Sequence, residues 1–173
     1  MNEEDRAVLE LQLGRPPRAV RRVLVRCPWG APAVTEQAPY DDAGSPFPTT
    51  YYLTCPALVR AVARVEAGGG VERWSRQAAN DPLLRESLAR ATEEQRAVRE
   101  ELAEGRVGRD GGASLALGIA GASDPRQLKC LHAHVAFALA RPGYALGDRI
   151  VADVGQLFPD GECCLERPLP SSA

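Results

Sequence analysis

Residues 118–140 read GIAGASDPRQLKCLHAHVAFALA, and no other stretch of the chain gathers so many chemically reactive side chains. It holds both histidines, the only lysine and one of the five cysteines: His132, His134, Lys129 and Cys130. A helix is predicted to begin here, since Asp124 or Ser123 can cap it and Pro125 suits its first position, where a missing N–H costs nothing. We expect the fold to be organised around this helix.

The spacing in this helix predicts which side chains face the core. At about 100° per residue, one apolar stripe forms, from Leu128, Leu131, Val135, Ala138 and Leu139. Cys130 and His134 are four residues apart on one face, so their Cβ atoms lie roughly 6 Å apart and both can bind one metal ion. His132 lies about 160° from Cys130 and is predicted not to share that ion. Without a metal, Cys130 would be a small buried hydrophobic residue and the histidines half-buried surface residues.

Length and composition indicate one globular domain over residues 1–173, with 45% hydrophobic and 25% charged residues. The net charge of -2 favours no class of partner, and no nucleic-acid partner is predicted because no basic run exceeds Arg21-Arg22. No apolar run approaches the ~20 residues that span a bilayer, and the N-terminus is unlike a secretory signal. We therefore expect a cytoplasmic protein without a membrane partner. Thiols stay reduced there, so five cysteines favour metal ligation, catalysis or core packing over disulfides.

The whole chain predicts an α+β fold, in which a small three-stranded antiparallel sheet packs against four to five helices. The strands are expected at 20–26, 32–36 and 49–54, the first two forming a hairpin around Cys27-Pro28-Trp29-Gly30. Helices are expected within 1–15, from Pro56 to Gly68, at 71–79, from Pro82 to Gly105, in the central stretch and at 147–158. Residues 165–173 are expected to form a frayed tail. The glycine-rich stretch 105–123 is either a flexible loop or a cradle for an anion or cluster.

The cysteines stand singly at element boundaries rather than in paired CxxC motifs, apart from an adjacent pair in the tail: Cys27, Cys55, Cys130, Cys163 and Cys164. Cys55 precedes a helix, where the helix dipole favours a thiolate. Scattered single cysteines are typical of a [4Fe–4S] cluster, which takes four of them, or three with an open iron. We expect Cys27, Cys55, Cys130 and Cys163 or Cys164 to converge on such a cluster at one end of the sheet.

Several alternatives stay open at this point. A zinc ion held by three cysteines and His134 or His132 is the nearest rival to the cluster, and metal-free core cysteines are the simplest reading. With a cluster, the protein would be a redox protein or an enzyme acting on a small molecule, using Lys129, His132 or His134 for anion binding or proton transfer. With structural zinc, it would be a non-catalytic module that binds another protein. Nucleophilic catalysis by Cys55 or Cys130 with a histidine base is a further alternative.

Three segments resemble the bacterial family catalogued as domain of unknown function 501. They read RCPWGAPAV, PFPTTYYLTCPALVRAVARVEAGG and LKCLHAHVAFALA, and the TCP and KCLH motifs are specific. The resemblance runs from about Gln12 to Gly147, and the family brings no established activity. It implies counterparts of Cys27, Cys55, Cys130, His132 and one cysteine near the C-terminus. It therefore ties His132 to the site more firmly than His134, either as a catalytic group or as a group behind the ligands, and it leaves the choice between Cys163 and Cys164 open.

Overall fold

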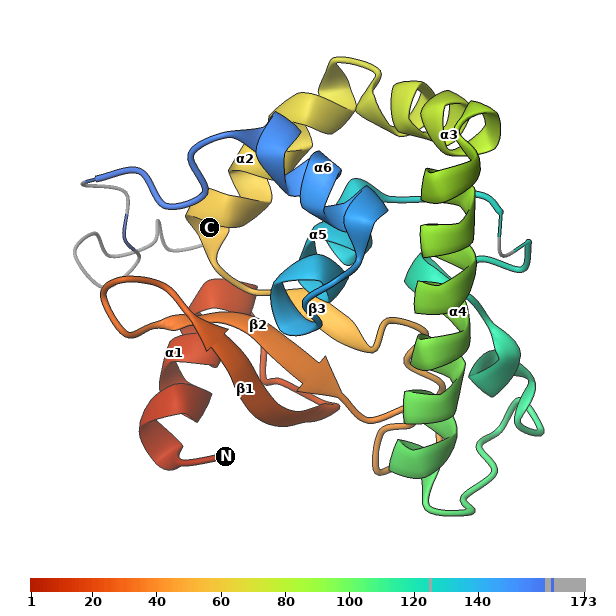
Figure 1. Ribbon diagram of the computed structural model, residues 1–173. Helices are drawn as coiled ribbons and strands as arrows, with labels where there is room; N and C mark the ends of the chain where they lie inside the picture. Colours follow the sequence, from red (N-terminus) through yellow and green to blue (C-terminus); the bar gives the residue numbers. More distant parts are fainter. Residues whose placement is uncertain (125, 161–162, 164–173) are drawn as a thin grey trace.

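The structure, a computed structural model, describes residues 1–124, 126–160 and 163 and confirms the predicted α+β fold (Figure 1). The antiparallel sheet has the order β1-β2-β3, with β1 at Val20–Arg26, β2 at Pro32–Gln37 and β3 at Tyr51–Leu53. The described residues form six α-helices: α1 (Glu3–Leu13), α2 (Pro56–Ala67), α3 (Gly70–Asn80), α4 (Pro82–Ala103), α5 (Leu131–Ala140) and α6 (Ala145–Val154). Two short 3-10 helices, η1 (Ala113–Ala116) and η2 (Ile119–Gly121), lie between α4 and α5. Among the described helices, none combines the length and apolar character that a membrane span requires.

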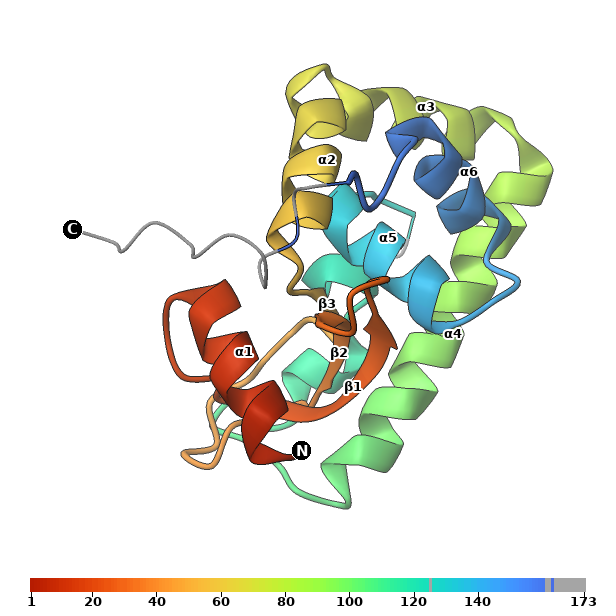
Figure 2. The same ribbon diagram turned by 90° about the vertical axis from the view of Figure 1, so that its left-hand side faces the viewer.

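The β1–β2 hairpin forms around the predicted turn. The N–H of Gly30 donates to the carbonyl oxygen of Cys27 at 2.9 Å, and Gly30 has φ +85°, a conformation that side chains disfavour. All six residues of β2 are buried, so both faces of this central strand are covered. Helix α1 contacts β2, while α5 packs on the sheet from the other side (Figures 1 and 2). The sheet is therefore sandwiched between the N-terminal helix and the central one.

Helix α5 is the centre of the core. It is buried almost all round, as expected of a helix enclosed by other elements and not of one that faces solvent on one side. The ring of Phe137 meets Tyr51 of β3 edge to face at 5.3 Å and meets Tyr144 at 5.2 Å. Helices α2, α4 and α6 surround α5 in both ribbon views (Figures 1 and 2). The single apolar stripe predicted for this helix therefore understates its burial.

The predicted start of the central helix is wrong. Helix α5 begins at Leu131, and Cys130 is its N-cap residue with an extended backbone at φ -159° and ψ 125°. Asp124 does accept a hydrogen bond from the N–H of Arg126 at 2.9 Å, but no helix follows it. The N–H of Leu131 instead donates to the carboxylate of Glu66 at 2.5 Å. A side chain from α2 thus caps α5, and local sequence does not reveal such a tertiary cap.

Candidate functional site

A pocket of about 370 Å³ opens between β3, α2 and α5. Its lining residues are Thr49, Tyr51, Tyr52, Leu53, Val59, Ala120, Cys130, His132 and Ala133. Most of these side chains are apolar or aromatic, and the two that carry metal-binding or nucleophilic chemistry are Cys130 and His132. The pocket therefore gives a small molecule access to the start of α5.

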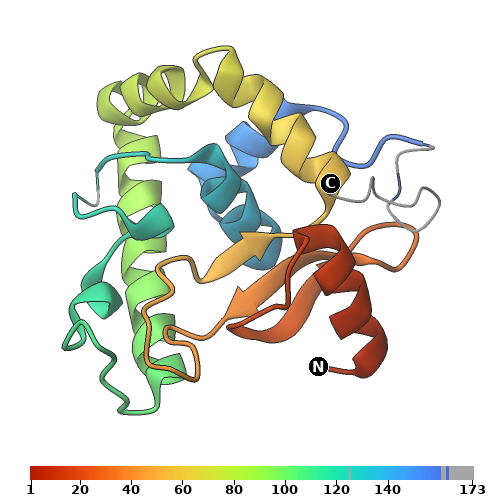
Figure 3. The ribbon, with the colours of Figure 1, turned by 180° about the vertical axis from the view of Figure 1, so that it is seen from behind.

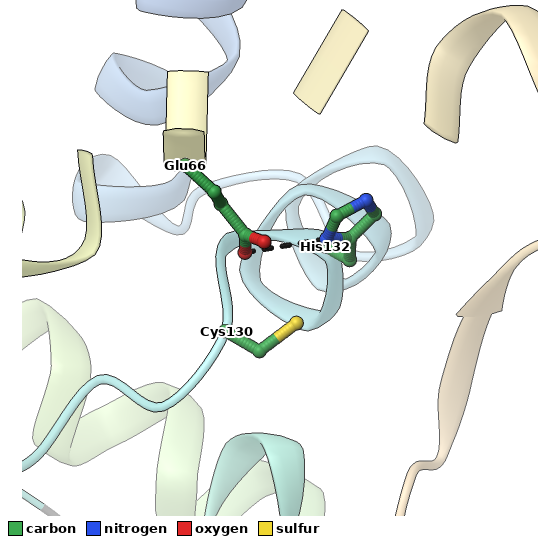
Figure 4. Close-up of side chains that lie close together, drawn as sticks. All are labelled: Glu66, Cys130 and His132. Atoms are coloured by element: carbon green, nitrogen blue, oxygen red, sulfur yellow. Dashed lines mark ion pairs between the residues drawn. The ribbon is translucent and has the colours of Figure 1, made fainter. Parts of the chain in front are cut away.

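Three side chains meet at this edge of the pocket: Glu66, Cys130 and His132 (Figure 4). One ligand atom from each lies within 4.8 Å of the other two, and all three residues are half-buried. Glu66 comes from the last turn of α2, Cys130 occupies the N-cap position of α5, and His132 is the second residue of α5. A carboxylate oxygen, a thiol sulfur and an imidazole nitrogen are all accepted ligands of zinc.

The two ring nitrogens of His132 have different partners. Nε2 lies 3.1 Å from the carbonyl oxygen of Val59, and because a carbonyl can only accept, Nε2 must donate its proton there. Nδ1 lies 3.2 Å from Oε1 of Glu66. Figure 4 shows this same nitrogen on the side of the ring nearer the sulfur of Cys130, with Nε2 pointing away. The lone pair of a neutral His132 would therefore face Glu66 and Cys130.

The pKa of His132 is raised to about 9, mainly because the side chain of Cys130 hydrogen-bonds to it. The charges of Cys130 and Glu66 act in the same direction, while burial opposes them. In the metal-free protein the imidazole is therefore protonated at neutral pH. A metal ion that binds through Nδ1 must displace this proton.

The extended backbone of Cys130 explains why the predicted separation of Cys130 and His132 around the helix does not occur. On a continuous helix, Cys130 and His132 would point about 160° apart. Cys130 is extended instead, so the helical wheel does not apply to it, and both side chains reach the same site. His134, the predicted partner of Cys130, is not part of this trio. It is fully buried, its Nδ1 lies 2.7 Å from the hydroxyl of Tyr144, and burial lowers the pKa of His134 to about 3.

Cys27, Cys55 and Cys163 lie elsewhere, and all three are buried. The pKa of Cys27 is raised, mainly by burial. Hydrogen bonds from the backbone N–H groups of Trp29 and Ala31 oppose this shift. The charges of Cys163 and Cys55 add to it. Cys27 is therefore within electrostatic range of both Cys55 and Cys163. None of the four described cysteines is in a disulfide, and Cys164 lies outside the described residues.

Helix α2 separates the predicted cysteine set into two places. Cys55 caps its N-terminus and Glu66 stands in its last turn, so at about 1.5 Å per residue their Cα atoms lie roughly 16 Å apart along the helix axis. Cys130 belongs to the Glu66 end. Within the described ranges, no second group of three metal-binding side chains is as close together as Glu66, Cys130 and His132.

The remaining candidate, Lys129, is exposed and donates to the carbonyl oxygen of Gly121 at 2.9 Å, outside the pocket lining. The residue that the sequence did not reveal is Glu66. Its position in the last turn of α2 gave a faint indication, because a carboxylate there faces the negative end of the helix dipole and is locally unfavourable. Its contacts with His132 and Leu131 compensate for that placement.

The comparisons with known proteins give a family and no activity. Neither a curated protein nor a solved structure matches the chain. The family model described as Protein of unknown function (DUF501) matches residues 23–152, a span that includes the whole of the pocket and its Glu66, Cys130 and His132 edge. Because this match covers about three quarters of the 173 residues, the chain belongs to the DUF501 family.

Proposed function

We propose that the protein binds a zinc ion through Glu66, Cys130 and His132 and that this ion acts on a small molecule held in the adjacent pocket. The ligand atoms would be a carboxylate oxygen of Glu66, the sulfur of Cys130 and Nδ1 of His132. Three protein ligands with a fourth position open to substrate are typical of catalytic zinc, whereas structural zinc is closed by four. Cys130 and His132 line the pocket, so the fourth position would face it.

The observation that carries this proposal is that the two ring nitrogens of His132 have different partners. A histidine that binds a metal usually donates its other ring N–H to a carbonyl or carboxylate, which fixes its tautomer and orientation. Nε2 of His132 has such a partner in the carbonyl of Val59. In a thiol–imidazole catalytic pair, one ring nitrogen serves the thiol and the other the carboxylate. Here Glu66 and Cys130 lie toward the same nitrogen, which favours a shared metal ion.

The pocket limits what the ion can act on. A volume of about 370 Å³ walled mainly by Tyr51, Tyr52, Leu53 and Val59 fits a small molecule with an apolar or aromatic body. Such a molecule would place one polar atom at the open zinc position, where the ion polarises a carbonyl or activates water. The proposed function is therefore Lewis-acid chemistry on a small, largely apolar substrate.

Zinc affinity of ligand variants tests the proposal. Metal-free protein is titrated with zinc against a chromophoric chelator of known affinity. Cys130→Ser and His132→Ala are each expected to weaken binding at least 100-fold, as loss of a direct ligand should. Cys55→Ser, which removes a buried thiol at the far end of α2, serves as the matched control and should bind as the wild type does. Wild-type protein that binds no zinc, or variants that bind it equally well, would contradict the proposal.

A second candidate site is favoured by the surroundings of Cys27. Its sulfur receives two backbone N–H groups, from Trp29 and Ala31, and lies in electrostatic range of Cys55 and Cys163. Hydrogen bonds to cysteine sulfur are one of the means by which proteins tune iron–sulfur clusters, and a cluster with one open iron takes three cysteines. An iron–sulfur cluster in this protein would therefore use Cys27, Cys55 and Cys163, and Cys130 would not be a ligand.

Iron and sulfide analysis of protein purified without oxygen tests this second candidate. A brown protein with iron and acid-labile sulfide is expected, and Cys27→Ser should lose both. Cys130→Ser should keep the colour, because it removes a thiol of the other site. Colourless wild-type protein without sulfide would exclude the cluster and leave the zinc proposal standing.

A further inference from the structure

Helix α4 contains a buried arginine that the pocket and its metal ligands do not involve. Arg99 is 0% exposed, and among the residues that the structure describes, no carboxylate forms an ion pair with it. Its Nη1 donates to the carbonyl oxygen of Phe47 at 3.0 Å and lies 3.5 Å from the hydroxyl of Thr50. Its Nε and Nη2 are buried and have no hydrogen-bond partner in the described part of the chain. Burying a charge without a counter-charge costs free energy. We therefore expect an acceptor of negative charge to bind beside Arg99.

Other buried donors near Arg99 also have no hydrogen-bond partner among the described residues. Nε2 of Gln95, one helical turn earlier and 2% exposed, has no partner among the described residues, and the hydroxyl of Tyr40, also 2% exposed, has none either. The backbone of Tyr40 pairs with that of Pro46, next to Phe47, whose carbonyl oxygen accepts a hydrogen bond from Arg99. Tyr40 therefore lies near the guanidinium, and it opposes the lowering of the pKa of Arg99 that burial causes. Gln95 and Arg99 are four residues apart and so lie on one face of α4. Three side chains thus bring unused donors to one buried place.

Two segments of the chain enclose these donors. Residues 38–50 and 105–122 lie beside the C-terminal half of α4 (Figure 3). They are joined where the N–H of Arg109 donates to the carbonyl oxygen of Gly44 at 2.8 Å. The ring of Tyr40 packs against Gly108, where an added Cβ would lie only 2.2 Å from the ring. The ring of Tyr40 is therefore held in place, and its hydroxyl is buried.

We propose that Arg99, Gln95 and Tyr40 form a buried binding site for a small oxyanion, either inorganic phosphate or the carboxylate of a small molecule. The open groups of Arg99 and the amide nitrogen of Gln95 can only donate, so the missing partner must accept several hydrogen bonds. It must also be negative, because no carboxylate pairs with the guanidinium in the described chain. The free Nε and Nη2 groups of Arg99 lie on one edge of the planar guanidinium, and such an edge is suited to bind two oxygens of one oxyanion at once. Water accepts fewer hydrogen bonds and provides no charge.

Asp110, an acid that acts on the pKa of Arg99, does not fulfil this role. The carboxylate of Asp110 also opposes the lowered pKa of Arg99, so it lies in electrostatic range. Its oxygens, however, accept backbone N–H groups, from Gly112 at 3.2 Å and from Ser114 at 2.7 Å. Asp110 therefore shapes the 105–122 segment, while the donors of Arg99 stay open to a ligand.

Thermal unfolding and calorimetry with sodium phosphate, and separately with sodium acetate, test the proposal on the full chain. Both are added to a chloride buffer at constant ionic strength. Saturable stabilisation of the wild type at millimolar phosphate or acetate is expected, and whichever anion acts identifies the source of the oxyanion. Tyr40→Phe keeps the packed ring and loses only the hydroxyl, so it should fold and bind roughly tenfold more weakly, as loss of one hydrogen bond to a charged group implies. Arg99→Met should abolish the effect.

Arg90→Gln is the matched control, because Arg90 is an exposed arginine of the same helix. It should bind the anion as the wild type does. The proposal is overturned if neither anion gives saturable stabilisation of the wild type. It is also overturned if Tyr40→Phe binds with unchanged affinity, or if Arg90→Gln loses binding to the same degree, since that result would indicate general screening of positive charge.

Discussion

Nδ1 of His132 lies 3.2 Å from Oε1 of Glu66, and the same oxygen accepts the N–H of Leu131 at 2.5 Å. One carboxylate therefore both caps the central helix and orients the imidazole next to it. This arrangement links the position of α5 to the geometry of the candidate zinc site, so a change at Glu66 should affect both.

Replacing Glu66 separates these two roles. Glu66→Gln keeps an oxygen that can cap α5 but loses the charge, so the free energy of unfolding should change by less than about 1 kcal/mol while zinc affinity falls about 10- to 100-fold. Glu66→Ala should lower both the free energy of unfolding and the zinc affinity, and the lost cap should cost about 1 to 2 kcal/mol of stability. Urea unfolding of metal-free protein and zinc titration measure the two effects. Equal zinc affinity in wild type and Glu66→Gln would show that this carboxylate is not a ligand.

The pKa of His132 predicts how the metal-free protein responds to alkaline pH. Its folded-state pKa of about 9 is above the unfolded value of about 6.5. The stability that protonated His132 contributes is therefore complete below pH 6.5 and is lost as the pH rises through 9. Urea unfolding across this window should show a loss on the order of 2 kcal/mol, after allowance for partial solvent screening. His132→Gln should remove most of this pH dependence, and an unchanged slope in that variant would assign it to other groups.

The affinity for zinc should increase with pH, whereas the stability of the metal-free protein decreases. Because the ion must displace the proton on Nδ1, the apparent zinc affinity should rise by up to about tenfold per pH unit until the pH reaches about 9. Zinc titrations at pH 6.5, 7.5 and 8.5, corrected for metal hydrolysis and buffer binding, measure this slope. A flat profile over that range would show that His132 does not bind the ion through a nitrogen that is protonated in the metal-free protein.

His134 predicts the opposite behaviour at acidic pH. Burial lowers the pKa of His134 to about 3 in the folded protein, below the unfolded value of about 6.5. The unfolded chain therefore binds more protons between these values, and stability should fall as the pH is lowered from 6.5 toward 3. Following the His134 ring by NMR through this range tests the assignment. A resonance that titrates near pH 6.5 in folded protein would contradict it.

The partner of His134 gives a stability prediction. Tyr144→Phe removes the hydroxyl that lies 2.7 Å from Nδ1 of His134 and leaves a fully buried ring nitrogen without its partner. The free energy of unfolding should fall by about 1 to 3 kcal/mol. Tyr52→Phe, at a half-buried tyrosine, is the comparison and should change stability by less than about 0.5 kcal/mol. Similar losses in both variants would assign the effect to something other than this hydrogen bond.

Local patterns predicted most of the fold but not the composition of the site. The CPWG turn, the β-prone runs on either side of it and the prolines at the starts of α2 and α4 depend on nearby residues, and the hairpin and both helices formed as expected. The start of α5 depends on Glu66, which lies more than sixty residues away in the chain. Because Cys130 is a capping residue, the helical spacing that paired it with His134 did not apply.

The zinc coordination sphere is the most direct test of the central claim. X-ray absorption at the zinc edge, on protein loaded with one equivalent of zinc, counts the sulfur ligands, since Zn–S bonds of about 2.3 Å are distinct from Zn–N and Zn–O bonds of about 2.0 to 2.2 Å. One sulfur per zinc, with the remaining ligands nitrogen or oxygen, is the result that Glu66, Cys130 and His132 predict. Three or more sulfurs per zinc would contradict it and would place the ion among Cys27, Cys55 and Cys163 instead.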